Sequence, residues 1–408
     1  MTATTEVRAA PAAGRRVRRS HRLSEVFDPS RNSLAFLRLL FAAMVLLDHA
    51  FPIGGFHGGL DPMWGWTKNQ ESFGGLAVAG FFIISGFLVT RSFATSSTTV
   101  RYIWKRFLRI FPGFWVCLLV TAAVIAPLAY LHEYGNLHGY LAAHPDSPTR
   151  YVRSNFWLQM NQYNIDGLLA GTPYSHSGYP MAFDGSLWTL IYEFKCYIAV
   201  GILGVFGIVR HGRYACLALA VGLWSAELAD TVDPGSVGRA FSPLADPQMV
   251  RMAFLFSLGV VLFLFREKIP MVGWLAAVAT VVLVVSMRTD LYPELGMIAF
   301  AYITFWLAVR LPIHNADRYG DFSYGLYIYA FPIEQMASLH SLYRWGLVPY
   351  VLITLVVSLV FAVVSWHVVE KPAMRLKRVR LPRSWQARWE MRRPAWWPTT
   401  RRALGAQQ

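Results

Sequence analysis

The sequence predicts an all-α integral membrane protein with about ten transmembrane helices and both termini in the cytoplasm. The prediction rests on composition, on the length of the apolar blocks and on the distribution of positive charge. Of the 408 residues, 55% are hydrophobic and 15% are charged, whereas soluble proteins have about 45–50% apolar and about 25% charged residues. This composition excludes a soluble enzyme, a disordered tail protein and a secreted disulfide scaffold.

The apolar residues lie in blocks of about 20, the length at which a helix crosses the hydrocarbon layer of a bilayer. Ten such blocks follow one another along the chain. We expect them at 34–53, 76–92, 107–131, 187–209, 214–230, 249–265, 271–287, 292–311, 322–340 and 347–369. Because this count is even, both ends of the chain are expected on the same side of the membrane.

The positive charges indicate which side that is. The chain has 38 Lys and Arg against 23 Asp and Glu, a net charge of +15. With the ten blocks as spans, 29 of these cations lie on the side of the termini and 7 on the other side, and such an excess is typical of cytoplasmic loops. We therefore attribute most of the charge to membrane orientation rather than to nucleic acid.

The same assignment divides the chain into three parts. They are a basic cytoplasmic arm at 1–33, a transmembrane domain at 34–371 with a long external loop at about 132–186, and a basic, Trp-rich cytoplasmic tail at 372–408. Arg and Trp alternate in the tail, which favours contact with membrane lipid over binding of nucleic acid.

The cysteines and histidines predict no metal site. Cys117, Cys196 and Cys216 lie inside apolar blocks without the spacing of metal ligands, so we interpret them as small buried hydrophobic residues. The four histidines of the external loop also lack a short ligand spacing.

Ionisable residues inside the spans are candidates for function, because a charge in hydrocarbon is costly unless it is paired or hydrated. Arg38 and His49, in the first span, are eleven residues apart, so they share a helix face with His49 about 16 Å further from the cytoplasm. A buried histidine can act as a general base. Asp48 points about 100° away from it on a helix, so it either supports His49 or orients a different group. The alternative is a polar contact between helices.

Candidate residues also lie in three further segments, of which the first two are in the second span and in the basic run that follows it. Ser85 and Gly86 lie in an aromatic, small-residue stretch that favours close helix packing. Arg106 and Arg109 share a face within the basic run 101–112, which could bind phosphate or anionic lipid.

The fourth span begins with Trp188, a candidate for the aromatic belt. Glu193 follows five residues later, and we expect it near the external interface, where its carboxylate needs a partner.

Over about residues 34–372 the sequence resembles the acyltransferase-3 family of polytopic membrane O-acyltransferases. The motifs that carry the resemblance are Arg38 with His49, Phe81-Phe82-x-x-Ser85-Gly86-Phe87-Leu88, Arg106-x-x-Arg109-x-x-Pro112, Trp188-Thr189-Leu190-x-x-Glu193, Ser323-Tyr324-x-x-Tyr327 and Glu370-Lys371-Pro372. Each motif is weak alone, but their joint order in the expected spans is specific.

The resemblance implies acyl transfer across the membrane. A cytoplasmic acyl-CoA would be the donor co-substrate, with acetyl-CoA as a candidate and with no tightly bound cofactor. A hydroxyl group of an external glycan or glycosylated small molecule would be the acceptor. The protein would then be a multi-pass O-acyltransferase of the bacterial plasma membrane.

The same resemblance assigns roles to residues. His49 would be catalytic, with Glu193 and Asp48 beside it, and Arg38, Arg106 and Arg109 would bind the donor. The supporting residues would be Ser85, Gly86, Trp188, Ser323, Tyr324 and Tyr327, of which Ser85 and the two tyrosines are candidate oxyanion donors.

Departures from the family pattern qualify these roles. Ala330 stands where many relatives have a second histidine, and Asp184 where some have asparagine. The 37 residues after 371 are too few for the external hydrolase-like domain that some members carry.

The main alternative is a secondary transporter in which Arg38, His49 and Glu193 form a substrate or proton path, although no matching halves are evident. A membrane scaffold would leave the intramembrane His and Glu unexplained.

Overall fold

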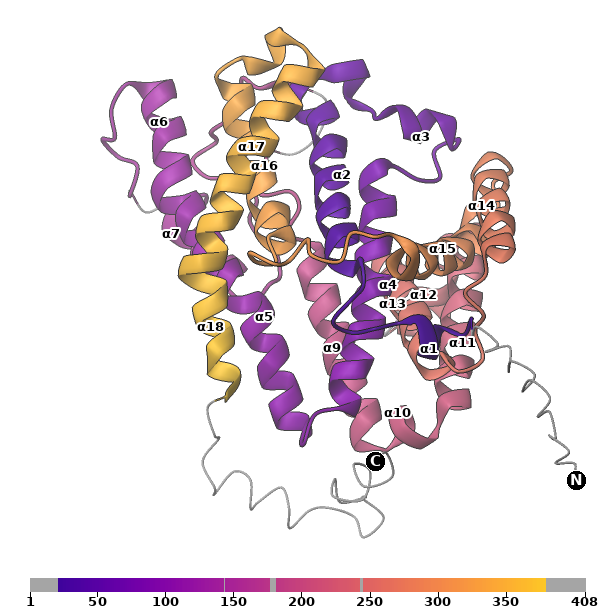
Figure 1. Ribbon diagram of the computed structural model, residues 1–408. Coiled ribbons are helices and arrows are strands. Elements are labelled where there is room, and N and C mark those ends of the chain that lie inside the picture. The colour runs from indigo at the N-terminus through magenta and orange to yellow at the C-terminus, as the bar shows by residue number, and fades with distance from the viewer. Residues whose placement is uncertain (1–20, 143, 177–180, 243–244, 379–408) are drawn as a thin grey trace, which may run out of the picture.

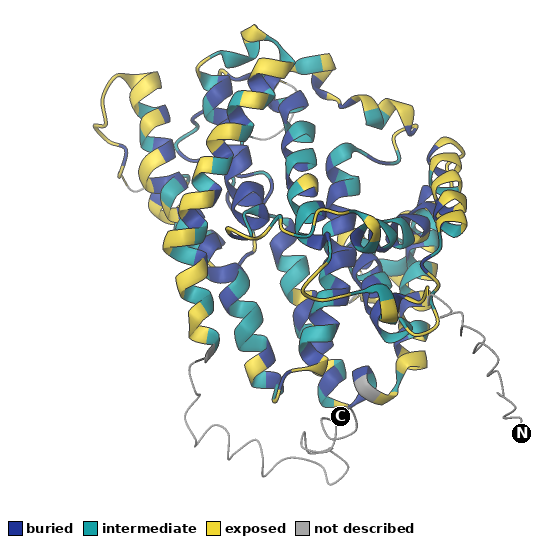
Figure 2. Ribbon diagram, viewed as in Figure 1, coloured by how far each residue is buried: buried dark blue, intermediate teal, exposed yellow. Residues whose placement is uncertain are grey.

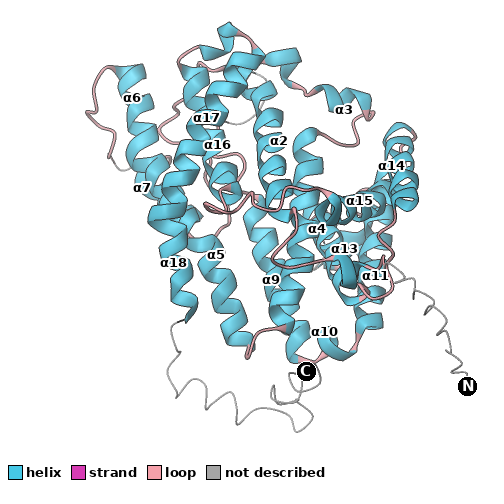
Figure 3. Ribbon diagram, viewed as in Figure 1, coloured by secondary structure: helices cyan, strands magenta, loops and turns pink. Residues whose placement is uncertain are grey.

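The computed structural model describes residues 21–142, 144–176, 181–242 and 245–378. In this part of the chain the structure is helical, and two isolated bridges are its only β pairing (Figure 3). Each of the ten predicted blocks contains a helix. These helices are α2 (Leu34–Gly54), α4 (Phe73–Ala94), α5 (Thr99–Val120), α9 (Thr189–Val205), α11 (Arg213–Val232), α13 (Pro247–Leu264), α14 (Gly273–Arg288), α15 (Met297–Arg310), α16 (Ser323–Leu339) and α17 (Leu347–Ser365).

Shorter segments connect and extend them. The short α-helices are α1 (Leu23–Val26), α3 (Pro62–Trp66), α6 (Ala126–Tyr134), α7 (Pro148–Asn155), α8 (Pro173–His176), α10 (Ile208–His211), α12 (Ser236–Ala240) and α18 (Lys371–Arg375). Three π-helical segments continue the long helices: Thr121–Ile125 joins α5 to α6, Tyr292–Gly296 leads into α15, and Trp366–Glu370 joins α17 to α18. Short 3-10 turns lie at Phe56–Gly59, Leu342–Trp345 and Leu376–Arg378.

Seven helices among the described residues are long and apolar enough to cross a membrane, counting the extended helices Thr99–Tyr134, Tyr292–Arg310 and Leu347–Arg375. The other three, α9, α14 and α16, have 17, 16 and 17 residues. The chain is therefore a multi-pass membrane protein, and the count of ten stays a prediction. So does the cytoplasmic placement of the termini, since residues 1–20 and 379–408, which make up most of the predicted arm and tail, lie outside the described ranges.

The core is built around α16. This helix packs against α2 and α17, while α4 packs against α2 and α13 (Figure 1). Nearly every residue of α16 is buried, and Figure 2 shows its ribbon mostly dark blue. In contrast, α17 exposes Val356, Val360 and Val364, a stripe at four-residue spacing that fits contact with lipid. The three cysteines are buried and unpaired, as the sequence predicted.

The close approach of α4 and α13 depends on glycine. Gly86 of α4 and Gly259 of α13 face each other, and a Cβ atom on Gly86 would overlap the carbonyl oxygen of Phe256. A Cβ atom on Gly259 would overlap the carbonyl oxygen of Ile83. Both obstacles are backbone atoms, so no side chain can move aside. Gly86 therefore has the packing role that its sequence context favoured.

Replacing Gly86 by alanine should separate α4 from α13 and destabilise the protein by about 1–3 kcal/mol, the usual cost of overpacking. The matched control is Gly222→Ala in α11, where an added Cβ meets nothing within 4 Å. Thermal unfolding in detergent should show a lowered midpoint for Gly86→Ala and an unchanged or raised midpoint for Gly222→Ala, because alanine favours the helix. Equal midpoints for the two variants would contradict this account of the crossing.

Candidate functional site

Two of the predicted arginines meet at one carboxylate. Arg38 of α2 and Arg109 of α5 donate to the same oxygen of Asp321, at 2.7 Å and 2.6 Å. The other Asp321 oxygen accepts a hydrogen bond of 2.6 Å from the Ser323 hydroxyl. Arg109 also lies 3.7 Å from Glu370, near the end of the last long helix. Residues from four distant parts of the sequence thus form one cluster of opposite charges, which we call the arginine–carboxylate cluster.

Asp321 holds this cluster together. Burial by itself would raise the pKa of its carboxyl group, but the charges of Arg109 and Arg38 outweigh burial and hold that pKa well below its usual range. The sequence analysis did not single out Asp321. A signal was present, because an acidic residue two positions before the Ser323-Tyr324 motif can meet cations from neighbouring spans.

Arg106 lies one turn before Arg109 on α5 but has different neighbours. Its guanidinium lies over the ring of Tyr197, 5.6 Å from the centroid, and donates a long hydrogen bond of 3.4 Å to Ser92. Its Nε is buried and has no hydrogen-bond partner in the described part of the chain. Lys105, the preceding residue, donates to the Ser96 hydroxyl at 3.0 Å. The two predicted arginines therefore have different partners: Arg109 is paired with carboxylates, and Arg106 contacts an aromatic ring and a serine hydroxyl.

Glu193 has the partners that a partly buried carboxylate needs. One of its oxygens accepts hydrogen bonds from the Ser85 hydroxyl at 2.5 Å and the Tyr197 hydroxyl at 2.6 Å. Ser85 lies near the middle of α4, so Glu193, the fifth residue of α9, lies opposite the middle of a longer helix. The contact joins the second and fourth motifs of the resemblance, and Tyr197 links it to Arg106.

Asp48 and His49 face different surroundings, as their 100° separation on the helix allowed. Asp48 lies beside Asp61, Ser72 and the backbone of Gly74, at the start of α4. His49 packs edge-on against Phe331 of α16, with ring centroids 4.9 Å apart, and its buried Nδ1 has no hydrogen-bond partner within the described ranges. Asp48 is therefore placed to orient the start of α4 rather than the imidazole.

The hydroxyl protons of the candidate oxyanion donors are already used. Tyr324 donates to the carbonyl oxygen of Ile110 at 2.7 Å, and Tyr327 donates to that of Ser186 at 2.8 Å. Ser85 donates to the Glu193 carboxylate. A hydroxyl group has a single proton to donate, so in this structure all three residues hold helices and loops together.

The remaining predicted residues surround the same helices. Trp188 precedes α9 and packs edge-on against Tyr192, with centroids 5.7 Å apart. Ala330 is buried in α16 between two buried aromatic residues. One turn later, Glu334 is fully buried and its carboxylate oxygens have no hydrogen-bond partner among the described residues.

The segment before α9 is anchored through Asp184. One oxygen of its buried carboxyl group accepts from Thr121 at 3.0 Å and from Tyr151 at 3.3 Å. The next residue, Gly185, packs so closely on Phe331 that a Cβ atom would overlap the ring. Because Phe331 also contacts His49, this anchor supports one wall of the histidine environment.

Asparagine should replace Asp184 with little loss of stability at neutral pH. Burial raises the pKa of Asp184 to about 8, although hydrogen bonds from Thr121 and Tyr151 oppose the shift, so the group is mostly neutral at pH 7, as an amide is. A raised pKa gives stability that is present below about pH 4 and is lost as the pH rises toward 8. The thermal midpoint of the wild type should fall relative to that of Asp184→Asn over this range. A constant difference between the thermal midpoints of the two proteins at all pH values would contradict the raised pKa of Asp184.

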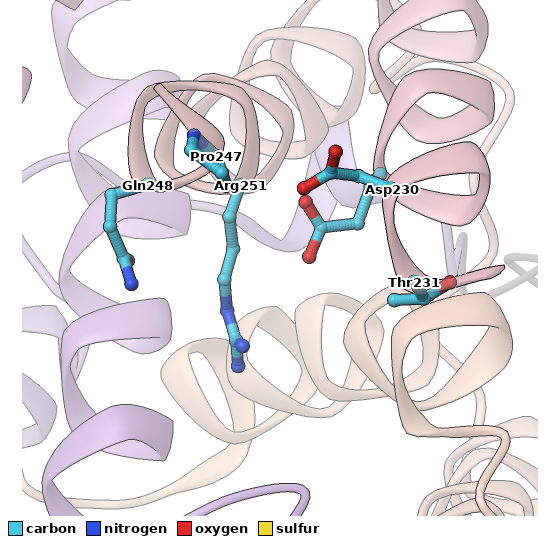
Figure 4. Close-up of a pocket in the computed structure, with 6 residues that line it drawn as sticks. Asp230, Thr231, Pro247, Gln248 and Arg251 are labelled. Carbon is cyan, nitrogen blue, oxygen red and sulfur yellow. The ribbon is translucent and has the colours of Figure 1, made fainter. Parts of the chain in front are cut away.

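Two cavities lie apart from this region. A polar cavity of about 120 Å³ lies between the end of α11 and the start of α13, with Asp230 and Thr231 on one side and Gln248 and Arg251 on the other (Figure 4). An apolar groove of about 620 Å³ lies where α5 bends into α6, and its wall includes Leu119, Tyr140 and Val152.

Comparison with known proteins finds a family model for an acyltransferase domain that matches residues 31–367. The chain is 28% identical over 345 residues to a protein of Shigella phage Sf6 named O-acetyl transferase, covering 82% of this chain and 93% of the relative. It is also 28% identical over 372 residues to nodulation protein 10 of Rhizobium leguminosarum bv. viciae, covering 85% of this chain and 94% of the relative. No solved structure matches the chain significantly.

Proposed function

Since the chain belongs to the acyltransferase family that this model describes, it is a multi-pass membrane O-acyltransferase, and we propose that it transfers an acyl group from cytoplasmic acyl-CoA to a hydroxyl group of an external glycan or glycoconjugate. We further propose that the acyl group is acetyl, which the name of the phage relative suggests, and that the membrane is the bacterial plasma membrane.

The observation that carries the proposal is the layout of α2. Arg38 at one end of this helix belongs to the arginine–carboxylate cluster, and His49, eleven residues further, has a buried and unpartnered ring nitrogen. The two residues are separated by about 16 Å along the helix axis. A donor whose phosphates lie near the cations and whose extended arm reaches His49 fits this arrangement, because the thioester would then meet the base.

His49 supplies the acid–base chemistry in this proposal. Its neutral imidazole takes the proton of the acceptor hydroxyl while that oxygen attacks the thioester carbonyl carbon. A new C–O ester bond forms, the C–S bond breaks, and the CoA thiolate leaves. The imidazolium then returns the proton to the sulfur, so that the products are the ester and free CoA thiol.

Purified protein in proteoliposomes, given acetyl-CoA labelled in the acetyl group, tests the function. Addition of a candidate glycan to the opposite side should produce labelled ester and an equal amount of free CoA thiol. Label that crosses the membrane as intact substrate without thioester cleavage would favour the transporter alternative. Absence of both cleavage and binding of acetyl-CoA would overturn the proposal.

A further inference from the structure

Not all cations near the proposed donor site are free to bind phosphate. Arg38 and Arg109 already contact Asp321, and Arg109 also lies near Glu370. Within the described residues, no ion pair joins Lys105 or Arg106 to a carboxylate, and their hydrogen bonds go to serine hydroxyls. Among the residues that the structure describes, the buried Nε of Arg106 has no hydrogen-bond partner. Among the described residues, Lys105 and Arg106 are therefore two neighbouring cations without a paired carboxylate.

A third cation is brought to this place by the end of the last long helix. α18 and the 3-10 turn Leu376–Arg378 pack along α5, and α18 ends toward the end of the molecule at which α5 begins (Figure 1). The indole N–H of Trp104, on α5, donates to the carbonyl oxygen of Leu376 at 3.3 Å. Lys377 follows directly and is half-buried. The turn thus holds this lysine against the segment that carries Lys105 and Arg106.

The electrostatic surroundings of Lys377 are unfavourable in the absence of an anion. Partial burial and then the charges of Arg109, Arg106 and Lys105 lower the pKa of Lys377 to about 8. Like charges brought together in a partly buried place repel one another, and a bound anion removes that repulsion. Phosphate oxygens form short, charge-assisted hydrogen bonds with such groups.

We propose that Lys105, Arg106 and Lys377 form the phosphate-binding site for the CoA donor, while Arg38 and Arg109 serve mainly to hold Asp321 and Glu370. The inference rests on the proposed function and adds Lys377, which lies outside every motif of the resemblance. The site would bind the phosphate groups of the nucleotide part of CoA and would make no contact with the acyl group.

The test compares Lys377→Ala with Arg375→Ala, which removes an exposed cation two residues away. The full chain is placed in phosphatidylcholine nanodiscs, and CoA binding is measured by calorimetry. Loss of one charge-assisted contact should weaken CoA binding about tenfold in Lys377→Ala. Arg375→Ala should bind within about twofold of the wild type, as expected for an exposed, screened charge.

A phosphate-free donor isolates the contact. Acetyl-pantetheine lacks the nucleotide and its phosphates, so the wild type and Lys377→Ala should turn it over at equal rates. An equal loss with acetyl-CoA and acetyl-pantetheine, or unchanged CoA binding in Lys377→Ala, would overturn the assignment of Lys377. Failure of the wild type to bind CoA would instead overturn the proposed function.

Anionic lipid headgroups share the phosphate chemistry, and a second set of nanodiscs separates the two sources. With phosphatidylglycerol added, a nucleotide site predicts the same ratio of CoA affinities between wild type and Lys377→Ala. A variant that loses bound phosphatidylglycerol but keeps its CoA affinity would show a lipid site and would contradict the proposal.

Discussion

His49→Ala should lower acetyl transfer by about a hundredfold to ten-thousandfold, the usual contribution of a general base. The affinity for CoA should remain unchanged, because the proposed phosphate site lies on α5 and on the turn Leu376–Arg378 and does not include His49. The structure explains why the effect should be confined to chemistry: the described contact of the His49 side chain is with the ring of Phe331. Transfer of labelled acetyl groups and calorimetric CoA binding, measured on the same preparation, check both parts.

Loss of packing has to be separated from loss of the base. His49→Gln keeps a polar side chain of similar reach but has no group that titrates near neutrality, so it should be as inactive as His49→Ala. The control is His340→Ala, because His340 is an exposed histidine near the end of α16. Transfer by His49→Gln at a rate near that of the wild type would remove His49 from the mechanism.

Asp321→Asn should destabilise the protein by about 3 kcal/mol and weaken its activity through misplacement of α2 against α5. Removal of one partner of a buried ion pair leaves uncompensated charge, at a cost of about 3–5 kcal/mol, and Asp321 is the shared partner of Arg38 and Arg109. Its side chain is 20% exposed, so the lower end of that range applies. Asp317→Asn, the same change at an exposed position of the same loop, should leave the thermal midpoint unchanged.

The pH dependence gives this prediction a sign. Because the pKa of Asp321 in the folded protein is depressed, its stabilisation is present above the unfolded pKa of about 4 and is lost as the pH falls toward the folded value. The difference in thermal midpoint between wild type and Asp321→Asn should therefore be largest at neutral pH and shrink in acid. A difference that grows on acidification would show that the ion pairs are not its cause.

The helices were accessible from sequence because each is encoded locally. A block of about 20 apolar residues has few alternatives to a membrane helix, and every predicted block contains one. The 100° rule also anticipated that Asp48 and His49 would face different neighbours. The packing role of Gly86 could be predicted from its position among aromatic residues, because a glycine there permits a close approach of two helices.

The partners of the charged residues were not accessible in the same way. Asp321 is 283 positions from Arg38, and Glu193 is 108 positions from Ser85. Which of many possible pairs forms depends on how the helices pack, and no local pattern reports that. Lys377 was counted with the charges that orient the chain, because only the turn after α18 brings it to α5.

The continuity of α2 has a consequence for selectivity. Arg38 and His49 lie on one continuous helix, so the distance between them is fixed by the rise of that helix. Under the proposed function, this fixed separation holds the base at a constant distance from the cluster, whichever acyl group the CoA ester carries. The separation between Arg38 and His49 therefore does not distinguish one acyl group from another. Discrimination between acyl groups has to come from side chains beyond the thioester, and the wall formed by Phe331 and Gly185 is the part of the molecule where a change of size would alter it.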